Sequence, residues 1–332
     1  PMAPPIQADE VKDTLADLRW LRELEEALGE VVVGQRGLVR GLLIGLLTGG
    51  HVLLEGVPGL AKSLAVASLA RGFYASFARI QFTPDLLPSD LLGTEVFQPK
   101  DGSFSPRKGP IFAHFVLADE VNRAPAKVQS ALLEAMQERQ VSIGGQSYPL
   151  PQPFLVLATQ NPLDQEGTYA LPEAQLDRFA LKILLDYPER AEELLILDRM
   201  ATTAPPPAMR RVASLGDIER ARRLLDGVGL ESRLREYIVS LVQATRRPKQ
   251  SGLAELEPLV RHGASPRATI TLALSARAEA LLEGRDHVIP SDIKRVAPAV
   301  LRHRVATTYE AEAKGLSSDL LIARVLEVVP VP

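Results

Sequence analysis

Short apolar runs alternate with segments of helical spacing over the first half of the chain. The runs are bounded by polar or turn residues, which is typical of buried strands. They lie at His51–Glu55, Phe77–Phe82, Ile111–Ala118, Phe154–Ala158 and Ala180–Leu185. Helical segments such as Gly34–Leu47 and Ser63–Arg71 lie between or beside them. Because strands separated by helices pair in parallel, the pattern predicts an α/β core with a parallel five-stranded sheet buried on both faces.

Two segments interrupt this core with further strand-like pieces. Residues 94–110 carry them on both sides of Asp101-Gly102, and residues 140–150 carry them around a Gly-Gly pair. Both dipeptides favour the tight turn of a β-hairpin. Phe97 and Phe104 flank the first turn with basic residues nearby, which suits contact with a polypeptide or a nucleic acid, or packing within the hairpin itself. We expect two inserted β-hairpins.

Amphipathic helices dominate after Tyr187-Pro188, and strand patterns vanish. The helices are expected at about 189–201, 215–227, 231–246, 267–283, 291–302 and 317–328. At the other end of the chain, leucines at helical spacing predict a helix over about 9–28, which Gly29 is expected to end. We therefore predict two domains: an α/β core over 1–187, with the N-terminal helix and both hairpins, and an all-α domain over 188–332.

Composition narrows the class of protein. A net charge of −3 gives no broad basic field for nucleic acid or an anionic membrane. Without cysteine there is no disulfide, thiolate zinc site or thiol nucleophile, and the five histidines show no metal-ligand spacing. No apolar run reaches the length of a membrane span, and the N-terminus lacks a secretory pattern. These features predict a cytoplasmic protein.

A glycine-rich turn follows the first strand and leads directly into a helix. It consists of Gly56, Val57, Pro58, Gly59, Leu60, Ala61, Lys62 and Ser63, and the next residue, Leu64, is also expected to contact nucleotide. This is a phosphate-binding (Walker A) pattern with Ala61 in place of a glycine. Its N–H groups and Lys62 would hold phosphates, and the Ser63 hydroxyl would join a Mg²⁺ shell. A plain glycine turn before a buried helix is the alternative.

Two later strands end in polar side chains that would complete such a site. Asp119 and Glu120 follow one of them: Asp119 would hold Mg²⁺ through water, and Glu120 would act as the general base toward the attacking water. Asn161 follows another strand, and it could orient that water if its strand lies between the other two. A solvated acidic turn and a routine Asn-Pro turn are the alternatives. Gln81 could couple Glu120 to remote binding, or be a polar residue at the edge of the core.

Together these motifs resemble the AAA+ superfamily, and more narrowly the MoxR family of AAA+ ATPases. The strings that carry the resemblance are EGVPGLAKS, QFTPDLLPSDLLG, GPIFAHFVLADEVNRAP, LLEAMQE, ATQNP, LPEAQLDRF and GASPRA. They are jointly specific, and the similarity extends from about residue 30 to the end. The resemblance implies ATP and Mg²⁺ as cofactors, a nucleotide-binding core, a helical lid, and a hexameric ring with sites at subunit boundaries.

The resemblance also assigns roles outside the phosphate loop. Arg178 matches the arginine finger, which would stabilise transition-state charge in a neighbouring subunit's site. A structural arginine that pairs with Asp177 or caps a helix is the alternative. Arg267 matches sensor 2, another phosphate-contacting arginine, which would act in cis or in trans. Val33 and Gly34 match the stretch that lines the adenine pocket.

The function implied is that of a MoxR-type chaperone. Such a protein would hydrolyse ATP to ADP and phosphate in a ring and remodel or activate a partner protein, commonly one with a von Willebrand factor A domain. A DNA-directed motor of the same clade and the ATPase subunit of a metal chelatase are the alternatives. The acidic balance and the lack of an appended DNA-binding module disfavour nucleic acid. The strings LPEAQLDRF and GASPRA favour the chaperone.

Overall fold

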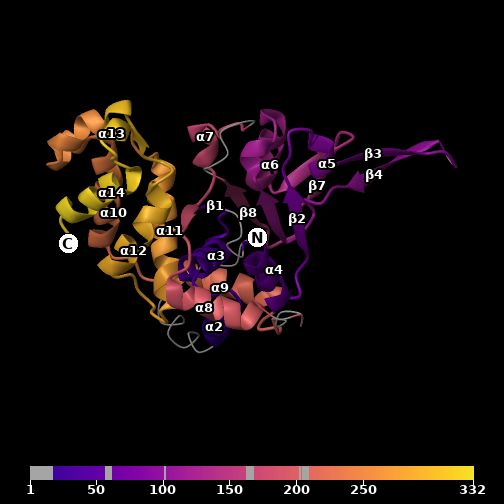
Figure 1. Cartoon of the computed structure of the whole chain (residues 1–332), viewed down its shortest axis with the longest axis horizontal. Coiled ribbons are helices and arrows are strands. Elements are labelled where there is room, and N and C mark those ends of the chain that lie inside the picture. The colour runs from indigo at the N-terminus through magenta and orange to yellow at the C-terminus, as the bar shows by residue number, and fades with distance from the viewer. Residues whose placement is uncertain (1–17, 57–61, 101, 162–167, 202, 204–208) are drawn as a thin grey trace. The chain divides into compact units, whose positions relative to one another are not determined.

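A computed structural model describes residues 18–56, 62–100, 102–161, 168–201, 203 and 209–332. Its contacts define two compact units, which we describe in turn (Figure 1). The α/β unit comprises Glu23–Pro172 and Ile183–Ile218. The helical unit comprises Glu173–Lys182, Glu219–Pro332 and the described residues up to Arg22. None of the helices in these ranges combines the length and the apolar character needed to cross a membrane.

A five-stranded sheet forms the centre of the α/β unit, which confirms the predicted fold class. Its strands are β1 (Val52–Gly56), β2 (Phe77–Gln81), β5 (Phe115–Asp119), β8 (Leu155–Gln160) and β9 (Leu181–Leu185), in the order β2-β5-β8-β1-β9. Strands β2, β5, β8 and β1 pair in parallel. Nearly every residue of β1, β5 and β8 is buried, as in a parallel sheet covered on both faces. Strand β8 lies between β5 and β1, as expected for the strand that precedes Asn161.

The helices around the sheet include the predicted ones, one of which ends at a different residue, and two that the sequence analysis did not place, over 88–92 and 126–138. They are α2 (Arg19–Val31), α3 (Arg36–Thr48), α4 (Lys62–Gly72), α5 (Pro88–Leu92), α6 (Ala126–Glu138) and α8 (Arg190–Met200). The expected stop at Gly29 is wrong, because α2 continues past it. Leu24, Leu28 and Val32 are all buried at helical spacing, so packing beyond Gly29 outweighs the preference of glycine for a break. The predicted start of this helix lies outside the described residues.

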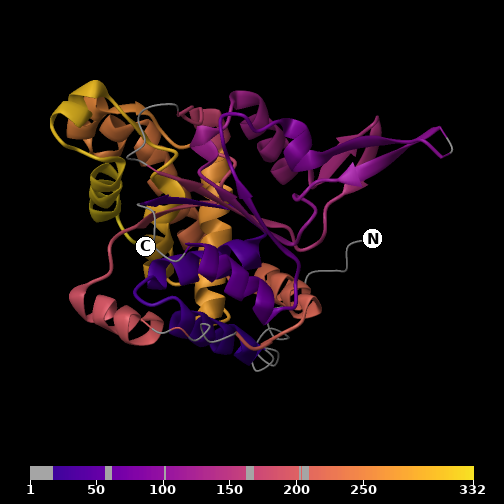
Figure 2. The same cartoon turned by 45° about the vertical axis from the view of Figure 1, so that its right-hand side comes forward.

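Both predicted hairpins are present. The first consists of β3 (Gly93–Gln98) and β4 (Ser103–Lys108), and the second of β6 (Gln140–Ile143) and β7 (Gln146–Pro149). Gly144 and Gly145 turn the second hairpin with φ angles of 58° and 79°, which only glycine adopts at low cost. Figures 1 and 2 show the β3–β4 hairpin extending away from the sheet of its own unit.

The helices predicted from residue 215 onward are all present, and from Glu219 onward they belong to the helical unit. They are α9 (Leu215–Gly227), α10 (Ser232–Arg246), α11 (Pro266–Leu282), α12 (Pro290–Leu301) and α14 (Ser318–Val328). The sequence did not predict α7 (Glu173–Leu176), α13 (Tyr309–Ala313) or the 3₁₀ turns Pro248–Ser251 and Ala254–Leu259. The expectation that strands vanish is also wrong, because β10 (Val260–His262) and β11 (Ala306–Thr307) form an antiparallel pair. Strands this short carry no readable alternation.

The chain passes between the two units more than once. Residues Glu173–Lys182 belong to the helical unit by their contacts, while Ile183–Ile218 belong to the α/β unit. The predicted domain boundary after residue 187 stays a prediction, because neither unit is one continuous stretch of chain. What matters for the site is that the segment containing Arg178 is grouped with the helices.

Candidate functional site

Three neighbouring strands of the sheet end in the candidate site residues. Strand β1 ends at Gly56, β5 ends at Asp119, and Asn161 directly follows β8. The register pairs Glu55 with Gln160 across β1 and β8. In parallel sheets the carboxyl ends of the strands share one edge, where ligands commonly bind. The three motifs that are far apart in the sequence therefore meet at one edge of the sheet.

The phosphate-loop candidates are described only at the two ends of the loop. Val57, Pro58, Gly59, Leu60 and Ala61 lie outside the described residues. Lys62 begins α4, and its Nζ donates to the Gly56 carbonyl oxygen at 2.8 Å. Burial lowers the pKa of the Lys62 ammonium, and the nearby carboxylates of Asp119 and Glu120 act in the opposite direction. Ser63 and Leu64 follow in the first turn of α4, both partly buried.

The packing of the sheet requires a glycine at position 56. A Cβ at this position would lie 2.6 Å from the backbone oxygen of Leu185 in β9. A backbone oxygen cannot give way as a flexible side chain can. The close approach of β9 therefore explains why the loop starts with glycine, independently of any phosphate.

The carboxylate of Asp119 is held on both oxygens. Thr159 Oγ1 in β8 donates to Oδ1 at 2.7 Å, and Arg79 Nη2 in β2 donates to Oδ2 at 2.6 Å. Thr159 is 1% exposed, whereas the Arg79 side chain is 53% exposed. Charge-assisted hydrogen bonds of this length fix the orientation of a carboxylate. Asp119 is thus oriented by both neighbouring strands.

Glu120 adopts a backbone conformation that is uncommon for a residue with a side chain. Its φ is 58°, in the left-handed region, which costs of order 1–3 kcal/mol for a residue other than glycine. Its N–H donates to Thr159 Oγ1 at 2.8 Å, and its Oε2 accepts from Gln81 Nε2 at 2.8 Å and Arg123 Nη1 at 3.2 Å. Strain of this kind is concentrated at functional sites.

Thr159 joins the two acidic residues through one hydroxyl. It donates to Asp119 and accepts from the backbone of Glu120, so it fixes both sides of the peptide that links them. We predict that Thr159→Val, which keeps the shape but removes the hydroxyl, lowers the free energy of unfolding by about 1–3 kcal/mol. Urea denaturation followed by circular dichroism measures this loss, and an unchanged midpoint would contradict it.

Asn161 and the adenine-pocket candidates lie in the same unit. Asn161 is partly buried, and its carbonyl oxygen accepts from Asn122 Nδ2 at 3.5 Å. Gly34 has a φ of 75°, and a Cβ there would lie 2.7 Å from Glu192 Oε2. Gln35 is buried and donates to the Asp186 carbonyl oxygen at 3.1 Å. The stretch that starts at Val33 is therefore fixed to the chain that follows β9.

The two candidate arginines lie in the helical unit, and one of them lies beside a carboxylate. Arg267 Nη1 lies 3.6 Å from Asp177 Oδ2. Arg178 is partly buried, and its side chain has no hydrogen bond or ion pair with any residue in the described ranges. The alternative of an Arg178–Asp177 pair is therefore not what the structure contains. Asp177 pairs with Arg267 and Arg304 instead.

Comparison of the amino-acid sequence with known proteins identifies the family to which the chain belongs. The sequence model described as "ATPase family associated with various cellular activities (AAA)" matches residues 51–181, and that of the AAA lid domain matches residues 254–325. The chain is 51% identical to Chaperone MoxR1 of Mycobacterium tuberculosis, over 93% of this chain and 82% of that protein. It is 33% identical to Protein MoxR of Methylorubrum extorquens, over 93% and 94% of the two chains. The chain belongs to the MoxR family of AAA+ ATPases.

Solved structures agree with the family assignment. The crystal structure of a Cytophaga hutchinsonii protein described as a candidate ATPase has a TM-score of 0.90 and 48% sequence identity, over 98% of each chain. A more distant similarity, 29% identity over 58% of this chain, connects it to the magnesium-chelatase 38 kDa subunit of Acidiphilium rubrum. The MoxR-family chain therefore has an AAA+ core and a helical lid, as the sequence predicts.

Sequence reasoning missed two residues that shape the site of this MoxR-family chain. Arg79 is one of them, although it alternates with Gln81 on β2, and residues two apart on a strand point to the same face. That polar alternation was the available signal. Thr159 is the other, a hydroxyl at the end of an otherwise apolar strand. Its contacts with Asp119 and Glu120 cross 40 and 39 residues of sequence, which no local pattern reveals.

Proposed function

We propose that this chain binds ATP with Mg²⁺ and hydrolyses it at the edge of the sheet formed by β1, β5 and β8. The observation that supports this most is the placement of Glu120. It is held in a strained conformation beside Asp119, within electrostatic range of Lys62. Carboxylates placed this way beside a lysine are what a phosphoryl-transfer site needs for a metal, a base and phosphate charge.

The side chains present fit a magnesium nucleotide. Mg²⁺ prefers hard oxygen ligands and is held by one or two carboxylates plus phosphates and water. Asp119 and Ser63 supply such oxygens. Within the described ranges no group of three or more His, Cys, Asp or Glu side chains is arranged to hold a metal alone, so phosphates would complete the shell. When bound, Mg²⁺ would neutralise the charge that develops on the phosphates.

The chain's own residues then have distinct tasks. Lys62, which forms one hydrogen bond to Gly56, would contact the β- and γ-phosphates with its remaining N–H groups. Glu120 would accept the proton of the attacking water, with Asn161 orienting that water. Val33, Gly34, Leu64 and the loop Val57–Ala61 would bind the rest of the nucleotide.

We further propose that the chain works as a hexameric ring in which Arg178 completes the site of a neighbouring subunit. Two observations support this: the Arg178 side chain forms no ion pair with any described residue, and it belongs to the helical unit. Arg267 would contact phosphate from the same unit, in cis or in trans. An arginine of this kind stabilises charge in the transition state rather than binding the ground state.

The shared site predicts an outcome for mixed rings. Arg178→Ala and Lys62→Ala subunits should each be nearly inactive alone. In random mixed rings about a quarter of the sites would combine an intact phosphate loop with an intact neighbouring arginine, and steady-state phosphate release should reappear. A mixture of Arg178→Ala with the Lys62→Ala/Arg178→Ala double variant is the control, because it has no complete site. Failure to regain activity in rings of confirmed mixed composition would count against a shared site.

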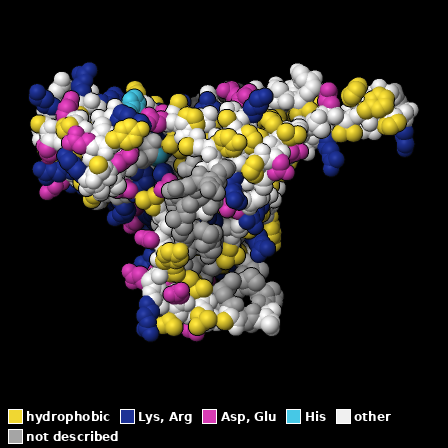
Figure 3. Space-filling model, turned by 45° about the horizontal axis from the view of Figure 1, so that its top comes forward, with side chains coloured by type: hydrophobic (Ala, Val, Ile, Leu, Met, Phe, Trp, Pro, Cys, Tyr) yellow, Lys and Arg dark blue, Asp and Glu magenta, His cyan; other side chains and the backbone are white. Residues whose placement is uncertain are grey.

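The client is proposed to be a protein that the ring remodels or activates, with a von Willebrand factor A domain as the candidate that the family resemblance suggests. The relative from Mycobacterium tuberculosis is named a chaperone. Phe97 and Phe104 on the β3–β4 hairpin are 52% and 64% exposed, with ring centroids 5.4 Å apart. Figure 3 shows hydrophobic side chains along this arm, with Lys or Arg beside them. An exposed aromatic pair of this kind suits contact with a polypeptide.

A capture experiment tests the client proposal. Glu120→Gln protein held in ATP is used as bait, and bound proteins are identified by mass spectrometry. A matched bait that also carries Phe97→Ser and Phe104→Ser should lose the specific partner while keeping nucleotide binding. Equal capture by both baits would remove the hairpin from the client site.

A further inference from the structure

The segment that carries Arg178 makes many of its polar contacts with the rest of the helical unit through one short stretch, residues 302–304. Three consecutive residues at the end of α12 contact it through its backbone. Arg302 Nη1 donates to the Lys182 carbonyl oxygen at 3.1 Å, and His303 Nε2 lies 3.0 Å from the Phe179 carbonyl oxygen. Arg304 makes the largest number of these contacts.

The Arg304 guanidinium is buried and engaged on all three nitrogens. Its Nε donates to Asp177 Oδ1 at 2.7 Å, its Nη2 to the Phe179 carbonyl oxygen at 2.6 Å, and its Nη1 to the Ala180 carbonyl oxygen at 3.0 Å. Nη1 also donates to the Val300 carbonyl oxygen in α12. The side chain is 1% exposed. Arg304 therefore joins the residues on both sides of Arg178 to the end of α12.

Burying the Arg304 guanidinium costs solvation free energy, and its carboxylate partner, Asp177, also contacts other residues. Burial lowers the pKa of Arg304, while the hydrogen bond and the charge of Asp177 raise it. The same aspartate accepts from Ser265 Oγ at 2.9 Å and lies beside Arg267. Ser265 is the N-cap of α11 and accepts from the Arg267 N–H at 3.2 Å. Asp177 thus connects the stretch containing Arg178 with the start of the helix containing Arg267.

We propose that Arg304 is a positioning residue that holds Arg178 and Arg267 in one fixed arrangement. It does so by fixing residues 177–180 to α12 through the Asp177 carboxylate and the carbonyl oxygens of Asp177, Phe179 and Ala180. Arg304 touches no nucleotide in this scheme and acts through the other two arginines. The inference rests on the proposed hydrolysis at a shared site, and it adds the residue that makes both arginines move together with the helical unit.

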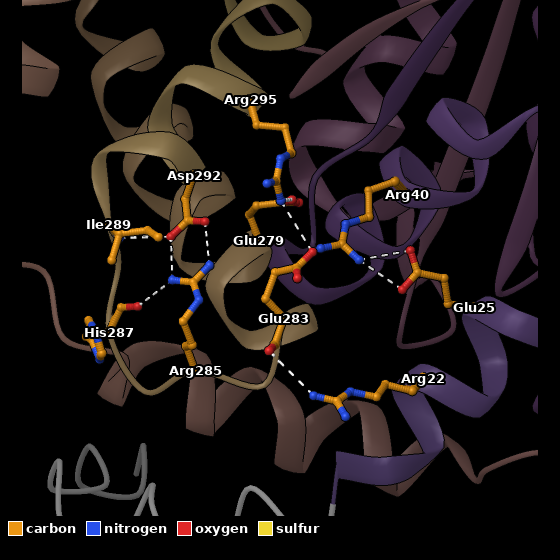
Figure 4. Close-up of polar contacts among 10 residues, drawn as sticks. All are labelled: Arg22, Glu25, Arg40, Glu279, Glu283, Arg285, His287, Ile289, Asp292 and Arg295. Carbon is orange, nitrogen blue, oxygen red and sulfur yellow. Dashed lines mark hydrogen bonds and ion pairs between the residues drawn. The ribbon is translucent and has the colours of Figure 1, made fainter.

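The chain offers a matched control for this role. Arg285 forms a bidentate pair with Asp292, which is fully buried, at 2.8 and 2.6 Å (Figure 4). It belongs to the same unit and also pairs with an aspartate, but its partners are Asp292 in α12 and the His287 carbonyl oxygen rather than residues 177–180. Arg285→Gln therefore reproduces the loss of an arginine that pairs with a partly or fully buried aspartate, without touching the Arg178 segment.

The first measurement compares ATP turnover in the ring. Arg304→Gln should lower kcat about 10²-fold and leave KM for ATP nearly unchanged, since misplacing a catalytic group by about 1 Å costs this much. Arg304→Lys keeps the charge but lacks the planar fork, so it should stay impaired. If Arg304→Gln does not fold, the same comparison is made with Arg304→Lys. Arg285→Gln should turn over at the wild-type rate. An equal loss of kcat in folded Arg304→Gln and Arg285→Gln proteins would overturn the inference.

The second measurement separates this inference from the proposed function. Mixing Arg304→Gln with Lys62→Ala subunits should restore activity as mixing Arg178→Ala with Lys62→Ala does, because the inference places both Arg178 and Arg267 in the site of the neighbouring subunit. If Arg178→Ala is complemented and Arg304→Gln is not, the role of Arg304 is overturned and the shared site stands. If neither is complemented, the shared site fails, and this inference fails with it.

Amide hydrogen exchange supplies a readout that does not depend on activity. In Arg304→Gln, amides of residues 177–182 should exchange faster than in wild type, while those of α14 stay protected. Arg285→Gln should leave residues 177–182 as protected as in wild type. Unchanged protection of this segment in folded Arg304→Gln protein would contradict the inference.

Discussion

Replacing Glu120 with glutamine should lower ATP turnover by about 10²–10⁴-fold while leaving nucleotide binding in place. The amide of glutamine cannot accept the proton of the attacking water, but it has nearly the same shape. In the structure Glu120 Oε2 accepts from Gln81 and Arg123, and the carboxamide oxygen can accept both bonds. Steady-state phosphate release measures turnover, and titration with a fluorescent nucleotide measures binding.

Glu25→Gln is the matched control for this change. Glu25 lies in the same α/β unit and forms an ion pair with Arg40 at 2.9 Å, also drawn in Figure 4. It is far in sequence from the strand ends and has no role in the proposed chemistry. Glu25→Gln should therefore hydrolyse ATP at the wild-type rate. Unchanged hydrolysis in Glu120→Gln would remove Glu120 from the role of base, and loss of binding would assign it a structural role instead.

Periodicity along the chain was sufficient to predict most of the fold. Buried parallel strands appear as continuous apolar runs, and amphipathic helices repeat every three to four residues, so both leave a local pattern. The error at Gly29 shows the limit of local reasoning. A glycine within a helix is tolerated when buried side chains continue on both sides of it, and Leu28 and Val32 do so here.

In the candidate site, the local sequence also predicts some features and not others. Lys62, Asp119 and Glu120 belong to short strings that can be read one at a time, and the strand order brings them together. The contacts that orient them cannot be read from such strings. Arg304 and Asp177 are separated by 127 residues, and Arg79 and Asp119 by 40. These pairs depend on tertiary packing, which single-sequence patterns do not contain.

His303 predicts that the helical unit loses stability in mild acid. The side chain is buried, its Nε2 faces the Phe179 carbonyl oxygen, and its Nδ1 has no hydrogen-bond partner among the residues that the structure describes. Burial lowers the pKa of His303 well below its ordinary value, and the charges of Arg304, Lys182 and Arg302 lower it further. Protonation would place a second cation beside Arg304 with no acceptor for its new proton.

The sign of the effect follows from which state binds the proton. Above about pH 6.5 His303 is neutral in both the folded and the unfolded chain, so it adds no pH dependence. Between that value and the lowered pKa of the folded state, His303 binds a proton in the unfolded chain but not in the folded chain. The free energy of unfolding should therefore fall by about 1.4 kcal/mol for each pH unit in this window.

His303→Gln isolates this contribution. The glutamine amide can still donate to the Phe179 carbonyl oxygen, but it does not titrate. His114, whose pKa is also lowered by burial, contributes equally to both proteins, so the difference between them reports His303 alone. Urea denaturation followed through the fluorescence of buried Trp20, the single tryptophan of the chain, measures both curves between about pH 7.5 and 5. Parallel curves would show that His303 takes up its proton in the folded state. Convergence toward acid pH would instead show that His303, buried against the Phe179 carbonyl oxygen beside Arg178, lowers the stability of the folded chain in mild acid.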